Sequence, residues 1–355
     1  MGPVTVLDAL TYPIVAAPMA GGVSTPALAG AVSEAGGLGF LAAGYLSPGV
    51  LREQIQAVRG LTARPFGVNL FVPGDPAADP EALNRYRDRL EAEAALYGAV
   101  LGEPVSDDDG WSEKLAVVRE TGVPVVSFTF GCPTRNTVAS LKAHGSSVVV
   151  TVTCLDEARI AAEAGADALC VQGPDAGGHR GTFANTGKVP DIGLIPLLRR
   201  ISAQIDLPMI ATGGLAHGAD VAAVLVAGAR AAQLGTVFLT CPESGANPTY
   251  KAALANRRFP GTAMTLAFSG RPARGLVNRF LLDHSAEAPV AYPHVHHLTR
   301  NLRAAAATAG DPEAMSLWAG QGYPFARDIP AADLVTTLAT QARTALADAT
   351  HRFAR

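Results

Sequence analysis

The sequence lacks most of the features that mark disulfide-rich, nucleic-acid-binding or membrane proteins. It has only four cysteines in 355 residues and no C-x-x-C pair, so we expect free thiols and no disulfide framework. Charged residues make up 17% and the net charge is −3, which gives no general electrostatic reason to bind nucleic acid or an anionic membrane. Gly, Pro or charge interrupts the apolar runs well before the roughly 20 residues that a membrane-spanning helix needs.

A secretory signal is also missing from the first eight residues, where no basic stretch precedes an apolar one. We therefore expect a cytoplasmic protein, in which free thiols are the ordinary state. Apolar residues, in contrast, are plentiful. At 48% they permit a sizeable core, and the length suits one large barrel domain or two average domains.

Short apolar runs alternate with Ala-rich helical segments along most of the chain. Such alternation is typical of parallel βαβ units, and runs that are apolar on both faces are typical of buried parallel strands. Eight of them predict a (β/α)8 barrel, the TIM barrel. The expected strands are residues 14–17, 38–42, 66–71, 123–128, 148–152, 168–172, 207–211 and 231–234.

Two parts exceed a minimal barrel. Residues 73–122 extend the connection between the third and fourth strands, with a charged helix near residues 81–97 and an exposed loop at 106–111. The second part is residues 241–355. Neither part looks like a separate unit, so we expect residues 1–240 to form the barrel core and residues 241–355 to cover its mouth in the same globular body.

The C-terminal part is predicted to be mainly helical. A loop bearing prolines and histidines at residues 289–297 precedes expected helices at 298–308 and 331–348. The cluster His294, His296 and His297 invites a metal interpretation. No Cys, Asp or Glu lies close by in the sequence and the spacing fits no familiar zinc pattern, so we expect no metal and a loop that lines the barrel mouth.

Two glycine turns lie where barrels commonly bind phosphate, after the seventh and eighth strands. Gly213-Gly214 follows one strand and Gly235-Thr236 follows the next. Glycine lets backbone N–H groups approach phosphate oxygens without a Cβ in the way. Either turn alone could be merely a tight connection, but two turns after consecutive strands favour a phosphate site.

The segment after the sixth strand, residues 172–181, is a glycine-rich loop that carries Asp175, His179 and Arg180. A neutral imidazole there could accept a proton, and an imidazolium could hold an anion. The alternative is a histidine that only orders its own loop. Because the two phosphate-type turns lie on the same face of the barrel, we predict that His179 is the central reactive side chain.

No other nucleophile or nucleotide signature stands out. Cys132 ends a strand but has no adjacent base in the sequence, so we expect an inert thiol. The chain has no G-x-S-x-G elbow, no Walker A sequence and no G-x-G-x-x-G opening a βαβ unit near its start.

Seven segments, in the same order along the chain, resemble the motifs of class I nitronate monooxygenases, formerly called 2-nitropropane dioxygenases. The resemblance covers nearly the whole sequence, and its order makes it more specific than any one motif. The C-terminal segments favour this family over NADH-consuming flavin reductases of similar fold. The matching segments are residues 13–26, 36–39, 68–71, 172–181, 243–244, 269–275 and 318–322.

The resemblance implies an FMN barrel with His179 as catalytic residue. At the substrate mouth the chain departs from the family: Thr129 stands where some members have His, and Tyr292, His296 and Arg300 align with Tyr, Tyr and Lys. Asp175 replaces the usual Glu. The cofactor-binding residues implied are Ala17, Pro18, Met19, Asn69, Gln172, Gly177, Gly178, Gly213, Gly214, Gln233, Gly235, Thr236 and Gln321.

By the same resemblance, electrons pass from a small anionic nitronate, such as propionate 3-nitronate, to the flavin, and O2 chemistry gives a carbonyl compound and nitrite. We expect a monomer or homodimer without nucleic-acid or membrane partners. Two kinds of enzyme remain as alternatives: an NAD(P)H-dependent flavin reductase acting on a quinone or an enoyl thioester, and a phosphate-binding isomerase or lyase without flavin. A binding protein without catalysis is a third.

Overall fold

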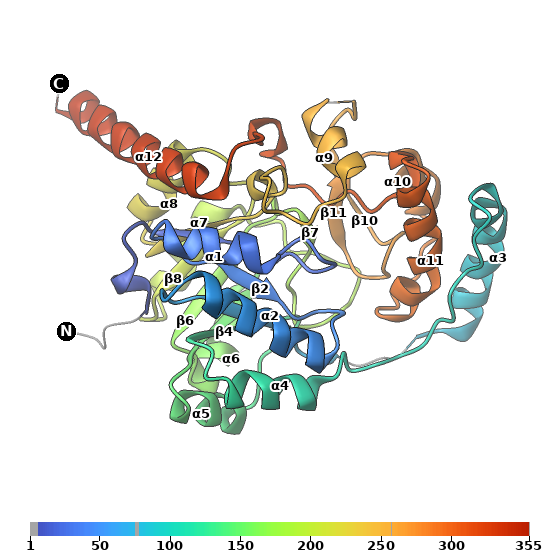
Figure 1. Cartoon of the computed structure of the whole chain (residues 1–355), viewed down its shortest axis with the longest axis horizontal. Helices are drawn as coiled ribbons and strands as arrows, with labels where there is room; N and C mark the ends of the chain where they lie inside the picture. The colour runs from blue at the N-terminus through green and yellow to red at the C-terminus, as the bar shows by residue number, and fades with distance from the viewer. Residues whose placement is uncertain (1–5, 75–77, 257, 355) are drawn as a thin grey trace.

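The computed structural model describes residues 6–74, 78–256 and 258–354 (Figure 1). Residues 1–5, part of the segment in which we expect no secretory signal, lie outside this description. Eight parallel strands form the central sheet in the order β1-β9-β8-β6-β5-β4-β3-β2, and a parallel bridge between Val15 and Leu38 closes it into a barrel. The predicted (β/α)8 fold is confirmed, with strands β1 (Ile14–Ala16), β2 (Phe40–Ala42), β3 (Gly67–Phe71), β4 (Val125–Thr129), β5 (Ser147–Val152), β6 (Ala168–Gln172), β8 (Met209–Thr212) and β9 (Ala231–Leu234).

Helices surround the barrel. The first helix begins with a residue pair typical of helix starts: Thr25 caps it by accepting a hydrogen bond from the N–H of Leu28 at 3.0 Å, and Pro26 fills the first helical position. The last packs against α8 and α1 and extends beyond the barrel at the upper left of Figure 1. These helices are α1 (Pro26–Glu34), α2 (Pro48–Leu61), α4 (Trp111–Glu120), α5 (Arg135–Ala143), α6 (Leu155–Ala164), α7 (Leu194–Ser202), α8 (Gly218–Val226) and α12 (Ala331–Phe353).

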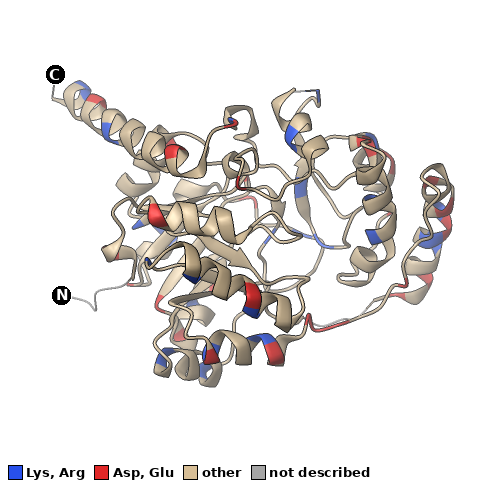
Figure 2. Ribbon diagram, viewed as in Figure 1, with Lys and Arg blue, Asp and Glu red and all other residues tan. Residues whose placement is uncertain are grey.

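Alternate strand residues face two different cores, as the two-residue period of a strand requires. One set, which includes Val15, Phe40, Val125 and Ile210, packs together inside the barrel with Leu7 from the short 3-10 helix η1 (Val6–Ala9). The residues between them pack outward against the helices. Figure 2 shows the charges gathered mainly on the helices, with few on the barrel strands. Within the described ranges, no helix is long and apolar enough to cross a membrane.

A second sheet, not predicted from the sequence, lies over the barrel. It has three antiparallel strands in the order β10 (Thr262–Thr265), β11 (Ala273–Leu276) and β7 (Gly178–His179). In it, His179 pairs with Ala273 and Gly178 pairs with Arg274. The sequence gives little sign of this sheet, because β7 is two residues long and its partner lies about ninety residues further along the chain.

The remaining α-helices lie above and to the right of the second sheet in Figure 1 and share a core of their own with it. They are α3 (Pro80–Leu96), α9 (Pro248–Ala255), α10 (Arg279–His284) and α11 (His294–Thr308). The expectation of a loop over residues 289–297 is wrong at its C-terminal end, because α11 already begins at His294. Val295 and Leu298 are completely buried and extend the apolar face of the helix toward its start, a pattern that the neighbouring histidines obscure.

Candidate active site

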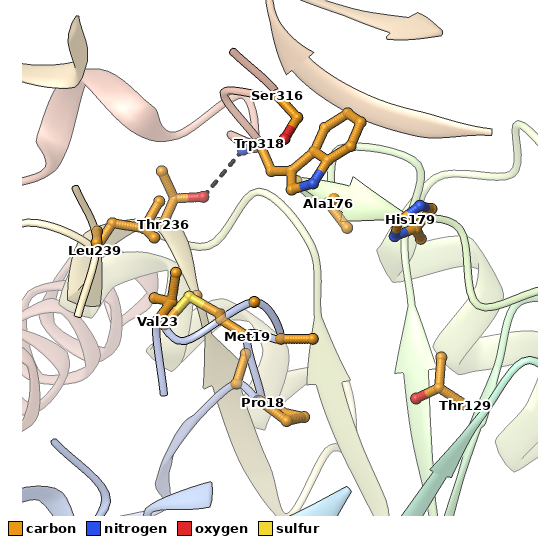
Figure 3. A pocket seen from close by; sticks show the side chains of 18 of the residues that line it. Pro18, Met19, Val23, Thr129, Ala176, His179, Thr236, Leu239, Ser316 and Trp318 are labelled. Atoms are coloured by element: carbon orange, nitrogen blue, oxygen red, sulfur yellow. Dashed lines mark hydrogen bonds between the residues drawn. The ribbon is translucent and has the colours of Figure 1, made fainter. Parts of the chain in front are cut away.

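A cavity of about 490 Å³ lies at the C-terminal ends of the barrel strands, beneath the second sheet and α11. Figure 3 shows Pro18 and Met19 at its lower edge, Thr236 to the left, His179 to the right and Trp318 above. The structure thus brings together most of the predicted site residues. Those that line the cavity are Ala17, Pro18, Met19, Asn69, Thr129, Gln172, Gly177, Gly178, His179, Gly213, Gly214, Gln233, Gly235, Thr236, His296 and Arg300.

Two predicted residues lie elsewhere. The side chain of Gln321 is exposed and is not among the described residues that line the cavity, although its neighbours Gly320 and Gly322 are. The backbone N–H of Gln321 donates to the carbonyl oxygen of Asp175 at 3.0 Å, which ties the C-terminal segment to the His179 loop. Tyr292 lines an adjoining smaller cavity.

His179 sits in an aromatic and polar setting. Its Nε2 lies 2.8 Å from Oγ of Ser269, and its ring centroid lies 5.4–5.8 Å from those of Phe130, Tyr292 and Trp318. Because Nε2 is engaged by the serine, Nδ1 is the ring nitrogen left for a ligand.

The surroundings of His179 favour a neutral imidazole. Burial, followed by the positive charges of Arg271 and Arg303, lowers its pKa to about 3. Both arginines are buried enough for their own pKa values to fall to about 10, so both remain charged at neutral pH. In the part of the chain that the structure describes, neither forms an ion pair with a carboxylate. Positive charge at the site therefore comes from arginine.

The sequence analysis singled out Tyr292, but not these arginines, Phe130 or Trp318. Arg271, Ser269 and Trp318 lie inside motifs that had already been noted, so only their roles were missing. The sequence does contain a pattern that points to Arg303. Because α11 begins at His294, the side chains of His296, Arg300 and Arg303 fall on one face of the helix, at spacings of four and three residues. The predicted loop concealed that spacing.

Two buried amides present defined faces to the cavity. Oδ1 of Asn69 accepts hydrogen bonds from the hydroxyls of Ser127 at 2.8 Å and Thr129 at 3.0 Å, so its amide N–H group is left for a ligand. Oε1 of Gln172 accepts from the backbone N–H of Gly181 at 2.9 Å, and its Nε2 donates to the carbonyl of His179. These bonds fix the orientation of both amides in the lining of the cavity.

The two glycine turns have the geometry of an anion cradle. No described residue accepts a hydrogen bond from the backbone N–H groups of Gly213, Gly214, Gly235 or Thr236. Gly213 and Gly214 have φ values of 116° and 75°, which favour glycine. A Cβ on Gly177 would lie 2.4 Å from the N of Gly320, so the backbone of this loop passes too close for a side chain. The residues present therefore fit a phosphate-bearing group.

Two of the three histidines of α11 have separate partners. The ring of His296 stacks on Tyr45 at 4.1 Å, and Nε2 of His297 pairs with Oδ2 of Asp107 at 2.7 Å. Cys132 is half-buried and its pKa is raised to about 11 by burial, so a thiolate nucleophile is disfavoured.

Comparison with known proteins gives one consistent answer. A family model described as nitronate monooxygenase matches residues 5–341. The chain is 42% identical over 348 residues to the nitronate monooxygenase of Pseudomonas aeruginosa. This alignment covers 96% of this chain and 98% of the relative.

Solved structures agree. The fold is similar to that of nitroalkane oxidase from Streptomyces ansochromogenes, with a TM-score of 0.92 and 52% identity over 96% of this chain and 99% of the other. It is less similar to FabK from Thermotoga maritima, with a TM-score of 0.72 and 27% identity over 98% and 97% of the two chains.

Proposed function

The chain belongs to the nitronate monooxygenase family, and from that premise we propose that it binds FMN and oxidises small anionic nitronates such as propionate 3-nitronate. It is a flavin-dependent oxidoreductase by family, which removes the isomerase, lyase and non-catalytic binding-protein alternatives. The products are a carbonyl compound and nitrite, with O2 as co-substrate. FMN, the substrate and the site roles below are parts of the proposal.

The observation that carries the proposal is the arginine charge around His179, from Arg300 and Arg303 in its cavity and from Arg271 behind the ring of Phe130. Uncompensated buried cations are costly, and a bound anion relieves that cost. Arg303 and Arg300 line the cavity itself, while Arg271, 3% exposed, adds its positive charge from the other side of Phe130. A nitronate is a resonance-stabilised anion, so this site offers it compensating charge and the desolvated setting in which that charge is strongest.

His179 acts in its neutral form. With a pKa of about 3 it carries no positive charge at neutral pH in the unliganded site, so its Nδ1 accepts a hydrogen bond. It can take up a proton once a nitronate anion beside it raises that pKa. Toward a neutral nitroalkane it serves as the base that removes the α-proton. Toward a preformed nitronate it orients the anion that the arginines hold.

FMN, when bound, supplies the electron transfer, and the protein supplies orientation and electrostatics. The N–H groups of Gly213, Gly214, Gly235 and Thr236 would hold its single phosphate. Asn69 and Gln172 would hydrogen-bond its ring. Ala17, Pro18, Met19, Gly177, Gly178 and Gln233 line the same cavity and would complete its binding.

Further parts of the proposal concern the whole protein. Residues 1–240 would carry the cofactor, and residues 241–355 would cover it as part of the same globular unit. We propose a cytoplasmic monomer or homodimer whose partners are its nitronate and O2.

One spectrophotometric comparison tests the function. The purified yellow protein is mixed anaerobically with propionate 3-nitronate, NADH or NADPH, and oxygen uptake is followed separately in air. We expect flavin reduction and oxygen uptake with the nitronate. Rapid reduction by NADH without nitronate oxidation would instead identify a flavin reductase.

His179→Asn, checked for a full complement of flavin, tests the residue. Asn keeps a polar group of similar reach but cannot act as a base at neutral pH. We expect a fall in kcat/KM of about 10²–10⁴ for a neutral nitroalkane, the usual contribution of a general base. An unchanged kcat/KM with both nitroalkane and nitronate would refute the role.

A further inference from the structure

Four aromatic rings close one end of the active-site cavity. Tyr45 lies edge-on to Phe71 with ring centroids 5.6 Å apart, Phe71 lies 4.5 Å from Phe130, and Phe130 lies 5.5 Å from Tyr292. The hydroxyls of Tyr292 and Tyr45, 3.1 Å apart, complete the circuit. We call these four residues the aromatic wall. Phe130 and Tyr292 also contact the ring of His179, so the wall stands next to the reactive side chain.

A second cavity of about 310 Å³ lies directly behind the wall. Tyr45, Phe71 and Phe130 line both cavities, whereas Tyr292 lines only the second among the described residues. The two spaces are therefore separated by single side chains. A ligand that lies against His179 and extends toward Phe130 stops at this wall.

The second cavity contains a buried cation, and two of its three carboxylates are already paired with a basic side chain. Arg271 lines it, with its guanidinium carbon 3.9 Å from the ring centroid of Phe130. Three acidic side chains line it: Asp107 pairs with His297 and Asp109 pairs with Lys114 at 2.7 Å, whereas Asp108 is exposed and accepts the backbone N–H of Gly110 at 3.0 Å. A polar or anionic chain end would be compatible with this space.

Backbone strain is concentrated at the wall. Outside glycine, the described residues with positive φ are Tyr45 at 68°, Asp109 at 56° and Phe130 at 74°. Two of these are wall residues, and Oδ1 of the third accepts the backbone N–H of Tyr45 at 2.8 Å. Left-handed backbone is uncommon for bulky side chains and persists where the surrounding structure enforces it, often at functional sites.

We propose that the aromatic wall sets the chain length of the substrate. It ends the substrate space next to His179, so the enzyme takes short nitronates and excludes longer ones from the cavity that holds Arg271. The inference rests on the proposed nitronate oxidation. Tyr45, Phe71, Phe130 and Tyr292 are thus specificity-determining residues.

The test compares kcat/KM for ethyl nitronate, hexyl nitronate and the nitronate of 6-nitrohexanoate. In the unaltered holoenzyme we expect both six-carbon substrates to be poor. Tyr292→Ala and Phe71→Leu, which thin the wall at different points, should raise the ratio of hexyl to ethyl nitronate by roughly tenfold or more. The carboxylate-bearing substrate should gain most, because its far end would reach Arg271.

Tyr292→Phe is the matched control, since it keeps the ring and removes only the hydroxyl; its ratio should stay within about twofold of the unaltered enzyme. A second readout needs no turnover: hexanoate and acetate are titrated into the oxidised holoenzyme, and the change in flavin absorbance reports binding. We expect hexanoate to gain affinity over acetate only in the wall-thinned variants.

The outcomes separate the two proposals. An enzyme that oxidises none of the nitronates contradicts the proposed function. An enzyme that oxidises ethyl nitronate but treats hexyl nitronate equally well before any substitution overturns the wall, whatever the variants do. Unchanged ratios in flavin-loaded Tyr292→Ala and Phe71→Leu overturn it as well.

Discussion

The two buried imidazoles of the site should make the protein sensitive to acid. Burial and nearby arginines lower the pKa of His179 to about 3 and that of His296 to about 2, against about 6.5 in an unfolded chain. Between these values the unfolded state binds protons that the folded state does not. The contribution of these two groups to the free energy of unfolding therefore rises with pH up to about 6.5, and it decreases as the pH falls below that value.

The magnitude follows from the proton count. Each group contributes about 1.4 kcal/mol per pH unit inside this window, which is about 2 kcal/mol per group between pH 7 and pH 5. Urea unfolding at both pH values, with flavin held at a fixed saturating concentration, measures the loss. His179→Asn and His296→Asn should each reduce the loss by about 2 kcal/mol, and the double variant by about 4 kcal/mol. A loss that stays the same in both single variants would refute the reasoning.

Three further predictions concern single side chains. Glu93→Gln removes the charge from the partly buried pair with Arg279, whose side chain is 37% exposed and whose Nη2 lies 2.5 Å from Oε1, and should lower the free energy of unfolding by about 1–2 kcal/mol in urea titrations. Gly214→Ala, at φ 75° and with its new Cβ 2.7 Å from Cβ of Asp175, should lower the flavin content of the purified protein; full retention of flavin contradicts the cradle. Arg303→Met should raise KM for an anionic nitronate at least tenfold and weaken its salt dependence; an unaltered KM contradicts the anion site.

Much of the fold could be predicted because it rests on local signals. Each barrel strand is a short apolar run, and α6 ends at Ala164, directly before Gly165, whose φ of 92° is typical of a glycine after a helix. The second sheet gave no such signal. Its strand β7 contains only Gly178 and His179, too short for any alternation to be read, and its pairing with β11 exists only after the chain has folded.

The candidate site was likewise predictable from the sequence only in part. The residues at strand ends, such as Asn69, Gln172 and Gly213, could be placed together because parallel strands in a barrel deliver their C-terminal ends to one face. Gln321 was chosen by resemblance alone, and its side chain is exposed. The hydroxyls of Tyr45 and Tyr292 meet although they are 247 positions apart in the sequence, and no local pattern encodes that encounter.

The sequence by itself therefore determined the barrel, the glycine turns and the position of His179, because hydrophobic period, turn chemistry and strand order are properties of neighbouring residues. Only the tertiary structure decided the state of that histidine. Its Nε2 is held by Ser269, ninety positions away, and its positive charge is suppressed by burial and by Arg271 and Arg303. Burial and electrostatic fields belong to the packed molecule, so the chemistry of His179 was settled by contacts that the chain makes only on folding.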